Sequence, residues 1–146
     1  MKTVLFVCTH NSARSQMAEG LLRHYAGDRF EAFSGGTEPG SLHPLAVRAM
    51  AEIGIDISEQ RSKSVDAFVG QQFDFVITVC DQARETCPVF PGATQQLHWS
   101  FSDPAAVEGS EHDRLDAFRR VREEIAVRIR RFISEQAVGE AEESRS

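Results

Sequence analysis

Residues 3–15 read Thr3-Val4-Leu5-Phe6-Val7-Cys8-Thr9-His10-Asn11-Ser12-Ala13-Arg14-Ser15. The apolar run at the start predicts a buried strand, and Ser15 begins a helix-like stretch. A strand, a tight loop and a helix N-terminus therefore follow one another directly. A loop of this kind points backbone N–H groups at a common centre, and the helix dipole adds positive potential there. The stretch predicts an anion-binding loop in an α/β fold.

Two side chains give this loop its expected chemistry. Arg14 carries a planar guanidinium that suits a tetrahedral oxyanion. Cys8 begins the loop, and the potential that binds oxyanions also lowers the pKa of a thiol. We therefore expect Cys8 to be a nucleophilic thiolate. The expected oxyanion-binding residues are Thr9, His10, Asn11, Ser12, Ala13 and Arg14. The alternative, a small apolar cysteine at the end of a strand, accounts less well for the polar loop.

Length and composition indicate one ordinary globular domain. The chain has 146 residues, of which 41% are hydrophobic and 26% charged, enough for a sizeable core. No apolar run reaches the ~18 residues that a membrane-spanning helix needs. The net charge is −6, and the sequence contains no basic tract. We therefore expect neither nucleic acid nor a membrane as a partner.

The numbers and spacing of cysteine and histidine indicate the cellular compartment of the protein and whether it binds a metal ion. The chain has 3 cysteines, an odd number that argues against a purely structural disulfide framework and fits the reducing cytoplasm. Its 5 histidines are scattered without the spacing of metal ligands. We therefore expect a cytoplasmic protein with no metal and no cofactor.

The rest of the chain alternates apolar runs with helical patterns. This alternation predicts a single-domain α/β fold, with a four-stranded parallel sheet flanked by helices. The expected strands are 2–7, 30–34, 73–79 and 97–101, and the expected helices are 15–26, 44–53, 65–69 and 113–134. Residues 1–134 form the expected catalytic domain. Residues 135–146 are acidic and poor in apolar side chains, so we expect a frayed or disordered tail.

Ligands of parallel α/β sheets bind beyond the carboxyl ends of the strands. Cys8 follows the first predicted strand, Cys80 the third and Asp103 the fourth. We therefore expect these three residues to lie together at one edge of the sheet.

Cys80 and Cys87 form a second candidate group, seven positions apart. In a helix this spacing puts two residues on one face but ~10 Å apart along the axis. A disulfide needs Cα atoms within ~7 Å, so a helical segment cannot also be oxidised. Two buried reduced thiols are one interpretation. With a nucleophilic Cys8 at the same edge, a three-thiol relay is the favoured one.

Asp103 precedes Pro104, which holds it in an extended conformation at the start of a loop. An aspartate that initiates a turn is one interpretation. The favoured one is a general acid that gives a proton to the leaving oxygen of a bound oxyanion.

These residues resemble the thioredoxin-coupled arsenate reductases, a family that shares the low-molecular-weight protein-tyrosine-phosphatase fold. The resemblance covers most of residues 3–133. It is carried by 8–20, by Phe33-Ser34-Gly35-Gly36, by Gly54-Ile55-Asp56-Ile57-Ser58, by Val79-Cys80 with Cys87-Pro88, and by His98-Trp99 with Phe101, Asp103 and Pro104.

The resemblance implies reduction of arsenate to arsenite. Cys8 attacks arsenate held by the loop amides and Arg14, and Asp103 protonates the departing oxygen. Cys80 then attacks Cys8, and Cys87 attacks Cys80 to leave a disulfide that thioredoxin reduces. Phosphate and sulfate are competing oxyanions. Ser15 would hydrogen-bond Cys8 and help to ionise it, and Asn11 would hold the shape of the loop.

The chain departs from this family at His10, at Ala13, which is cysteine in some relatives but lies outside the relay, and at Lys63. His10 stands where many relatives have glycine, so it must accept that backbone conformation. Some relatives bind a monovalent cation through residues matching Asn11, Glu19, Ser34 and an acid at position 63. Here Lys63 supplies an ammonium that could replace the cation, and no metal is predicted.

Three rival functions use the same loop. The first is a low-molecular-weight protein-tyrosine phosphatase, although Ala105-Ala106 provide no aromatic wall for an aryl phosphate. The second is a phosphoryl carrier, which would not need Cys80 and Cys87. The third is a redox sensor without enzymatic turnover.

Overall fold

Four parallel strands form one sheet in the order β2-β1-β3-β4 in the computed structural model, which describes residues 1–80, 90 and 92–145. The strands are β1 (Lys2–Cys8), β2 (Phe30–Gly36), β3 (Phe75–Thr78) and β4 (Gln95–His98). The central strand β1 is buried from Val4 to Cys8, which is why it reads as a continuous apolar run. The predicted four-stranded parallel α/β fold is confirmed.

The side chains of β2 show how the two faces of the sheet are covered. Successive residues of a strand point to opposite faces. Phe30 packs against Phe132 of the C-terminal helix, with ring centroids 5.5 Å apart. Phe33 points to the other face, where its ring lies 5.9 Å from Phe68 and 5.6 Å from Phe73. Both faces are therefore buried under aromatic side chains.

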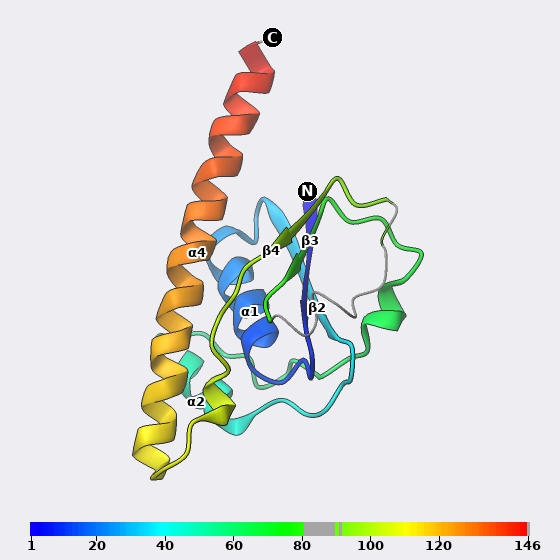
Figure 1. Ribbon diagram of the computed structural model, residues 1–146. Coiled ribbons are helices and arrows are strands. Elements are labelled where there is room, and N and C mark those ends of the chain that lie inside the picture. Colours follow the sequence, from blue (N-terminus) through cyan, green and yellow to red (C-terminus); the bar gives the residue numbers. More distant parts are fainter. Residues whose placement is uncertain (81–89, 91, 146) are drawn as a thin grey trace.

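Three helices pack together on one side of the sheet: α1 (Arg14–Ala26), α2 (Pro44–Ala51) and α4 (Glu111–Arg145). Two short 3₁₀ helices, η1 (Val65–Phe68) and η2 (Pro104–Ala106), complete the described elements. η1 packs against β2, and η2 packs against α4. Figure 1 shows α4 running along the whole body and projecting beyond it at the C-terminal end.

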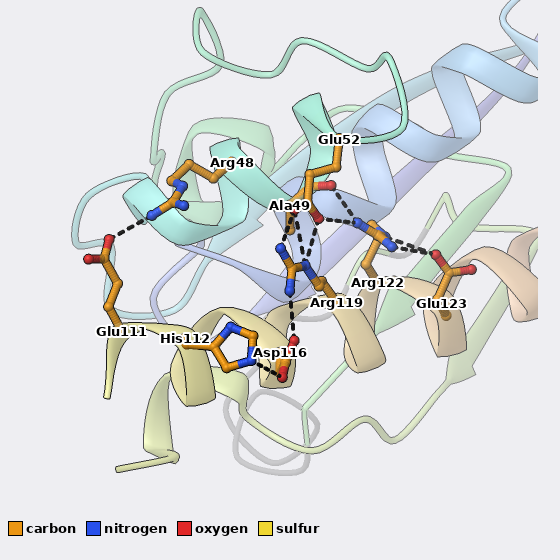
Figure 2. Close-up of polar contacts among 9 residues, drawn as sticks. All are labelled: Arg48, Ala49, Glu52, Glu111, His112, Asp116, Arg119, Arg122 and Glu123. Carbon is orange, nitrogen blue, oxygen red and sulfur yellow. Dashed lines mark hydrogen bonds and ion pairs between the residues drawn. The ribbon is translucent and has the colours of Figure 1, made fainter. Parts of the chain in front are cut away.

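An ion-pair network joins α4 to the end of α2 (Figure 2). The carboxylate of Glu52, just after α2, accepts hydrogen bonds from both Arg119 and Arg122. Arg122 is largely buried and also donates to the carbonyl oxygen of Ala49 at 2.7 Å. This network fixes α2 against the longest helix, and the N-cap residue of α2, His43, donates its N–H to the Ser12 carbonyl of the loop that follows β1.

Most element boundaries differ from the sequence prediction by one or two residues, and two elements differ by more. The fourth strand spans 95–98 instead of 97–101, because its partner β3 ends at Thr78, opposite His98. Trp99 then packs its ring against Phe6 and Phe132. The last helix continues from Ser134 to Arg145, so the expected division between domain and tail falls inside α4. Alanine, glutamate and glutamine are strong helix formers, and no proline interrupts them there.

Among the described residues, every helix is too short or too polar to cross a membrane.

Candidate active site

The loop between β1 and α1 is held by its carbonyl groups, which all turn outward to the scaffold. The carbonyl of Thr9 accepts from the N–H of Glu38 at 2.7 Å, and that of His10 from the N–H of Gly40 at 3.0 Å. The Ser12 carbonyl accepts from the N–H of His43 at 2.9 Å. The single segment between β2 and α2, residues 37–43, therefore fixes the loop from outside.

The amide groups of the same loop are left for a ligand. Within the part of the chain that the structure describes, the N–H groups of residues 10–14 donate to no backbone or side-chain acceptor. They belong to a loop that ends at the N-terminus of α1, whose first residue is Arg14. Unpaired amides at a helix N-terminus bind anions. The predicted oxyanion cradle therefore has its donors in place.

Asn11 is the residue that bends this loop. It has φ of 50° and is fully buried. Its amide donates to Ser15 Oγ at 2.8 Å, and its side-chain oxygen accepts from the N–H of Lys63 at 2.9 Å. The described residues give no positive φ to His10, so the backbone conformation of glycine that we expected there is wrong. Asparagine tolerates the left-handed region better than most residues, and Asn11 takes it instead.

Ser15 is buried at the start of α1, and the structure pairs its Oγ with Asn11. Because the hydroxyl oxygen accepts from the Asn11 amide, its own proton remains to be donated. Sequence reasoning missed Gln16, which is fully buried and donates to Asn11 Oδ1 at 3.0 Å and to the Arg61 carbonyl at 2.8 Å. A buried glutamine carries no distinct sequence signal, because its partners come from distant loops.

Arg14 and Asp103 face each other across the mouth of the loop. Arg14 Nη2 lies 3.9 Å from Asp103 Oδ2, and Arg14 Nη1 donates to the carbonyl of Phe101 at 3.0 Å. The Arg14 side chain is 13% exposed and that of Asp103 is 45% exposed. Asp103 also caps η2, because its Oδ1 accepts from the N–H of Ala105 at 3.0 Å. It therefore combines the predicted turn role with a position suited to a general acid.

A small cavity of about 50 Å³ collects most of the predicted residues. It is lined by Cys8, His10, Ser12, Ala13, Arg14, Asp103 and Ala105. The side chains of Thr9, Asn11 and Ser15 are not among those that line it, so their contribution is through the backbone or through support of the loop. A nucleophile, a guanidinium and a carboxyl group thus share one anion-sized space.

Cys8 and Cys80 lie side by side as thiols, both about 4% exposed. Cys80 is the group that most affects the pKa of the Cys8 thiol, and Cys80 Sγ lies 3.1 Å from Thr9 Oγ1. Contact with Cys80 and burial raise the pKa of the Cys8 thiol, while Arg14 and the N–H of Thr9 act to lower it. The low pKa expected from the loop alone is therefore wrong for this reduced pair. Cys87, the third expected thiol, lies outside the described residues.

His43 is a further supporting residue that the sequence did not reveal. Its Nδ1 accepts from the N–H of Leu45 at 3.1 Å and caps α2, while its backbone holds Ser12. Burial, together with Arg114, lowers the pKa of His43, and Asp103 opposes this shift. The ring is therefore kept neutral, as the cap requires.

The region suggested for a cation contains protein cations instead. Glu19 is buried, and its carboxylate accepts from Ser34 Oγ at 2.9 Å and from Arg23 Nη2 at 3.1 Å. Lys63 donates its ammonium to the Arg61 carbonyl at 2.7 Å. Arg23, rather than Lys63, is the cation in contact with Glu19. Among the described residues, no three His, Cys, Asp or Glu side chains gather as a metal site.

Known proteins are similar to this chain along nearly its whole length. The arsenate reductase of Halalkalibacterium halodurans is 47% identical over 131 residues, covering 90% of this chain and 94% of that protein. A solved arsenate reductase in the phosphate-binding state matches with a TM-score of 0.80 at 34% identity, covering 92% of this chain and 98% of that one.

A second similar solved structure is that of a thioredoxin-dependent enzyme. The thioredoxin-dependent arsenate reductase of Corynebacterium glutamicum matches with a TM-score of 0.73 at 33% identity, covering 95% of this chain and 63% of that one. The family of low molecular weight phosphotyrosine protein phosphatases matches residues 3–144, which include the loop, Cys80 and Asp103. With the fold and the Cys8–Arg14 loop in agreement, this chain belongs to the low molecular weight phosphotyrosine protein phosphatase family.

Proposed function

We propose that this protein reduces arsenate to arsenite through a relay of Cys8, Cys80 and Cys87, and that thioredoxin re-reduces it in the cytoplasm. The observation that carries the proposal is the contact between the Cys8 and Cys80 thiols beside the oxyanion loop. A phosphatase needs the loop, Arg14 and Asp103, but it has no use for a second thiol against its nucleophile. The arsenate reductases among the similar proteins support the same choice.

The first step uses the cavity residues. Arsenate binds to the loop amides and Arg14. The Cys8 thiol gives its proton to an arsenate oxygen, and its sulfur forms a bond to arsenic. An As–O bond breaks, and the leaving hydroxyl takes the proton of Asp103 and departs as water. Arg14, close to both the ligand and Asp103, balances the charge that this transfer creates.

The next steps move electrons from sulfur to arsenic. Cys80 attacks the Cys8 sulfur, so an S–S bond forms and the S–As bond breaks. The bonding pair stays on arsenic, which leaves as arsenite in the +3 state. Cys87 then attacks Cys80 and returns Cys8 as a thiolate, and a dithiol of thioredoxin reduces the Cys80–Cys87 disulfide. Overall, two thiols become one disulfide and one arsenate becomes arsenite and water.

Phosphate and sulfate should compete with arsenate, because all three are tetrahedral oxyanions and the loop offers amides and a guanidinium without a group specific to arsenic. The structurally similar arsenate reductase in its phosphate-binding state is consistent with this expectation.

Low-molecular-weight protein-tyrosine phosphatase activity through the same loop is the second candidate. The family membership and the pairing of Arg14 with Asp103 favour it. Its product would be inorganic phosphate, and Cys80 would be a bystander.

One assay separates these functions. Wild type, thioredoxin, thioredoxin reductase and NADPH should oxidise NADPH only when arsenate is present. Cys80→Ser should lose this turnover while its Cys8 loop still binds phosphate. If wild type oxidises no NADPH with arsenate, yet hydrolyses phosphate esters equally well with and without Cys80, the phosphatase function is correct.

A further inference from the structure

The side chain of His10 has no role in the proposed reaction, although its backbone N–H belongs to the cradle. Its side chain is exposed to solvent and also lines the cavity that holds Cys8, Arg14 and Asp103. A residue with both properties lies at the mouth of the cavity. Asp103 and Ala105 line the same space.

The ring of His10 is held in place rather than free to swing aside. Its Nδ1 lies 2.9 Å from the carbonyl oxygen of Glu38, and because a carbonyl can only accept, Nδ1 carries the proton. The main chain is anchored as well, since the His10 carbonyl accepts from Ser62 Oγ at 2.8 Å and from Gly40 N–H at 3.0 Å. The side chain is thus a fixed part of the wall.

The size of the cavity limits what can enter past this wall. Its volume is about 50 Å³. Pockets that enclose drug-sized organic ligands have ~300–1,000 Å³, whereas a water molecule needs ~10–15 Å³ by the same kind of measure. A five-atom oxyanion suits the space, so the aryl or alkyl group of a phosphate monoester would have to lie outside it, at the mouth where the His10 side chain stands.

We propose that the His10 side chain is a specificity-determining wall, which admits inorganic tetrahedral oxyanions and excludes phosphate monoesters. The proposal rests on the proposed function, because it explains why a phosphatase-like loop would act on arsenate and not on esters. Removal of the imidazole opens the mouth on the side of residues 38–40. An ester could then place its phosphoryl group in the cradle with its organic group outside.

The ester reaction that this opening allows is complete without another reagent. The Cys8 thiolate attacks phosphorus, a P–S bond forms and the ester P–O bond breaks. The leaving oxygen takes the proton of Asp103. Water then cleaves the P–S bond, which yields inorganic phosphate and returns the thiol.

The test compares wild type with His10→Ala, and uses His10→Gln as the matched control. Glutamine keeps a long side chain with an N–H that can reach the Glu38 carbonyl. Two quantities are measured: kcat/KM for para-nitrophenyl phosphate, and the inorganic phosphate concentration that protects Cys8 from iodoacetamide. The ratio of ester turnover to phosphate affinity should rise at least about tenfold in His10→Ala, the size expected when a pocket group is removed. It should stay near wild type in His10→Gln.

An unchanged ratio in His10→Ala would overturn the proposal, and so would an equal rise in His10→Gln. Loss of phosphate protection in both variants would also overturn it, because His10 would then support the loop instead of screening its ligands. Arsenite release by wild type is measured separately. Its absence would refute arsenate reduction, whereas the ester-to-phosphate ratio reports on His10 alone.

Discussion

At the scale of single residues, Cys80 changes what the anion-binding loop does to Cys8. The loop and Arg14 act to lower the pKa of Cys8, but the hydrogen bond with Cys80 and burial outweigh them. Cys80→Ala removes the thiol partner, so the pKa of Cys8 should fall toward that of an activated cysteine. Alkylation of the Cys8 peptide by iodoacetamide, followed by mass spectrometry against pH, measures this. In Cys80→Ser, which keeps a hydrogen-bonding group, the pKa of Cys8 should fall less. An unchanged dependence of Cys8 alkylation on pH in Cys80→Ala would contradict the effect of Cys80 on Cys8.

Asp103 offers a second test, because asparagine can replace one of its two roles and not the other. Asp103→Asn keeps an oxygen for the N–H of Ala105 and therefore keeps the cap of η2. It cannot give a proton to the leaving oxygen. Arsenite release in a single turnover should slow by ~10²–10⁴, the usual contribution of a general acid. Phosphate should still protect Cys8 from alkylation, and a near-normal release rate would reduce Asp103 to a turn residue.

These residues also show which part of the site a sequence can reveal. Cys8, Cys80 and Asp103 could be placed together because each follows a parallel strand, and such strands end at one edge. The pKa of Cys8 could not be predicted, because it depends on a contact between two thiols that are 72 positions apart. The partners of the loop carbonyls, such as Gly40 and His43, could not be predicted either, since they come from irregular segments without a motif.

At the scale of elements, the contact between α2 and α4 depends on Glu52 (Figure 2). Hydrogen bonds from Arg119, then Arg122, lower the pKa of Glu52 from 4.5 to about 2. A lowered carboxyl pKa stabilises the fold above the unfolded value, and this contribution is lost as the pH falls from 4.5 to about 2. Glu52→Gln should lower the thermal midpoint by a few degrees at pH 7, and the difference from wild type should shrink across that acid range.

Glu123→Gln is the matched control for the same melting curves. Glu123 pairs with Arg122 of its own helix, at 2.8 Å, and ties no second element to it. Its removal should therefore change the midpoint less than Glu52→Gln does. Equal decreases of the thermal midpoint in the two variants would show that Glu52 makes no special contribution to the contact between α2 and α4.

The helix and strand boundaries that the sequence missed have tertiary causes. Trp99 and Phe101 look like strand residues because they are apolar, but β3 ends at Thr78. The N–H of Trp99 still donates to the Thr78 carbonyl at 2.8 Å, and the ladder goes no further. The apolar pattern of α4 stops where the helix leaves the body, and the sequence of its last turns is rich in strong helix formers. Hydrophobic periodicity reports burial, so it marks where an element touches the core and not where its hydrogen bonds end.

At the scale of the whole molecule, the relay that we propose has to carry oxidation from the interior to a partner protein. Cys8 and Cys80 are each about 4% exposed, so a disulfide between them would lie beneath the surface. Exchange requires a thiolate to approach along the S–S bond, which a protein the size of thioredoxin cannot do in a recessed site. A third thiol on the same chain removes this obstacle, and Cys87, seven positions after Cys80, is the remaining cysteine.

Cys87→Ser should therefore separate the chemistry at arsenic from turnover. The Cys8 and Cys80 thiols supply the two electrons for one arsenate, so the variant should release about one arsenite per protein chain and stop with Cys8 bonded to Cys80. Cys80→Ser should release none and form no disulfide, whereas wild type oxidised without reductant should hold Cys80–Cys87. A single-turnover arsenite assay with peptide mapping of the disulfides distinguishes these states. Sustained thioredoxin-driven turnover by Cys87→Ser would refute the attack of Cys87 on Cys80, because thioredoxin would then reduce the buried Cys8–Cys80 disulfide directly.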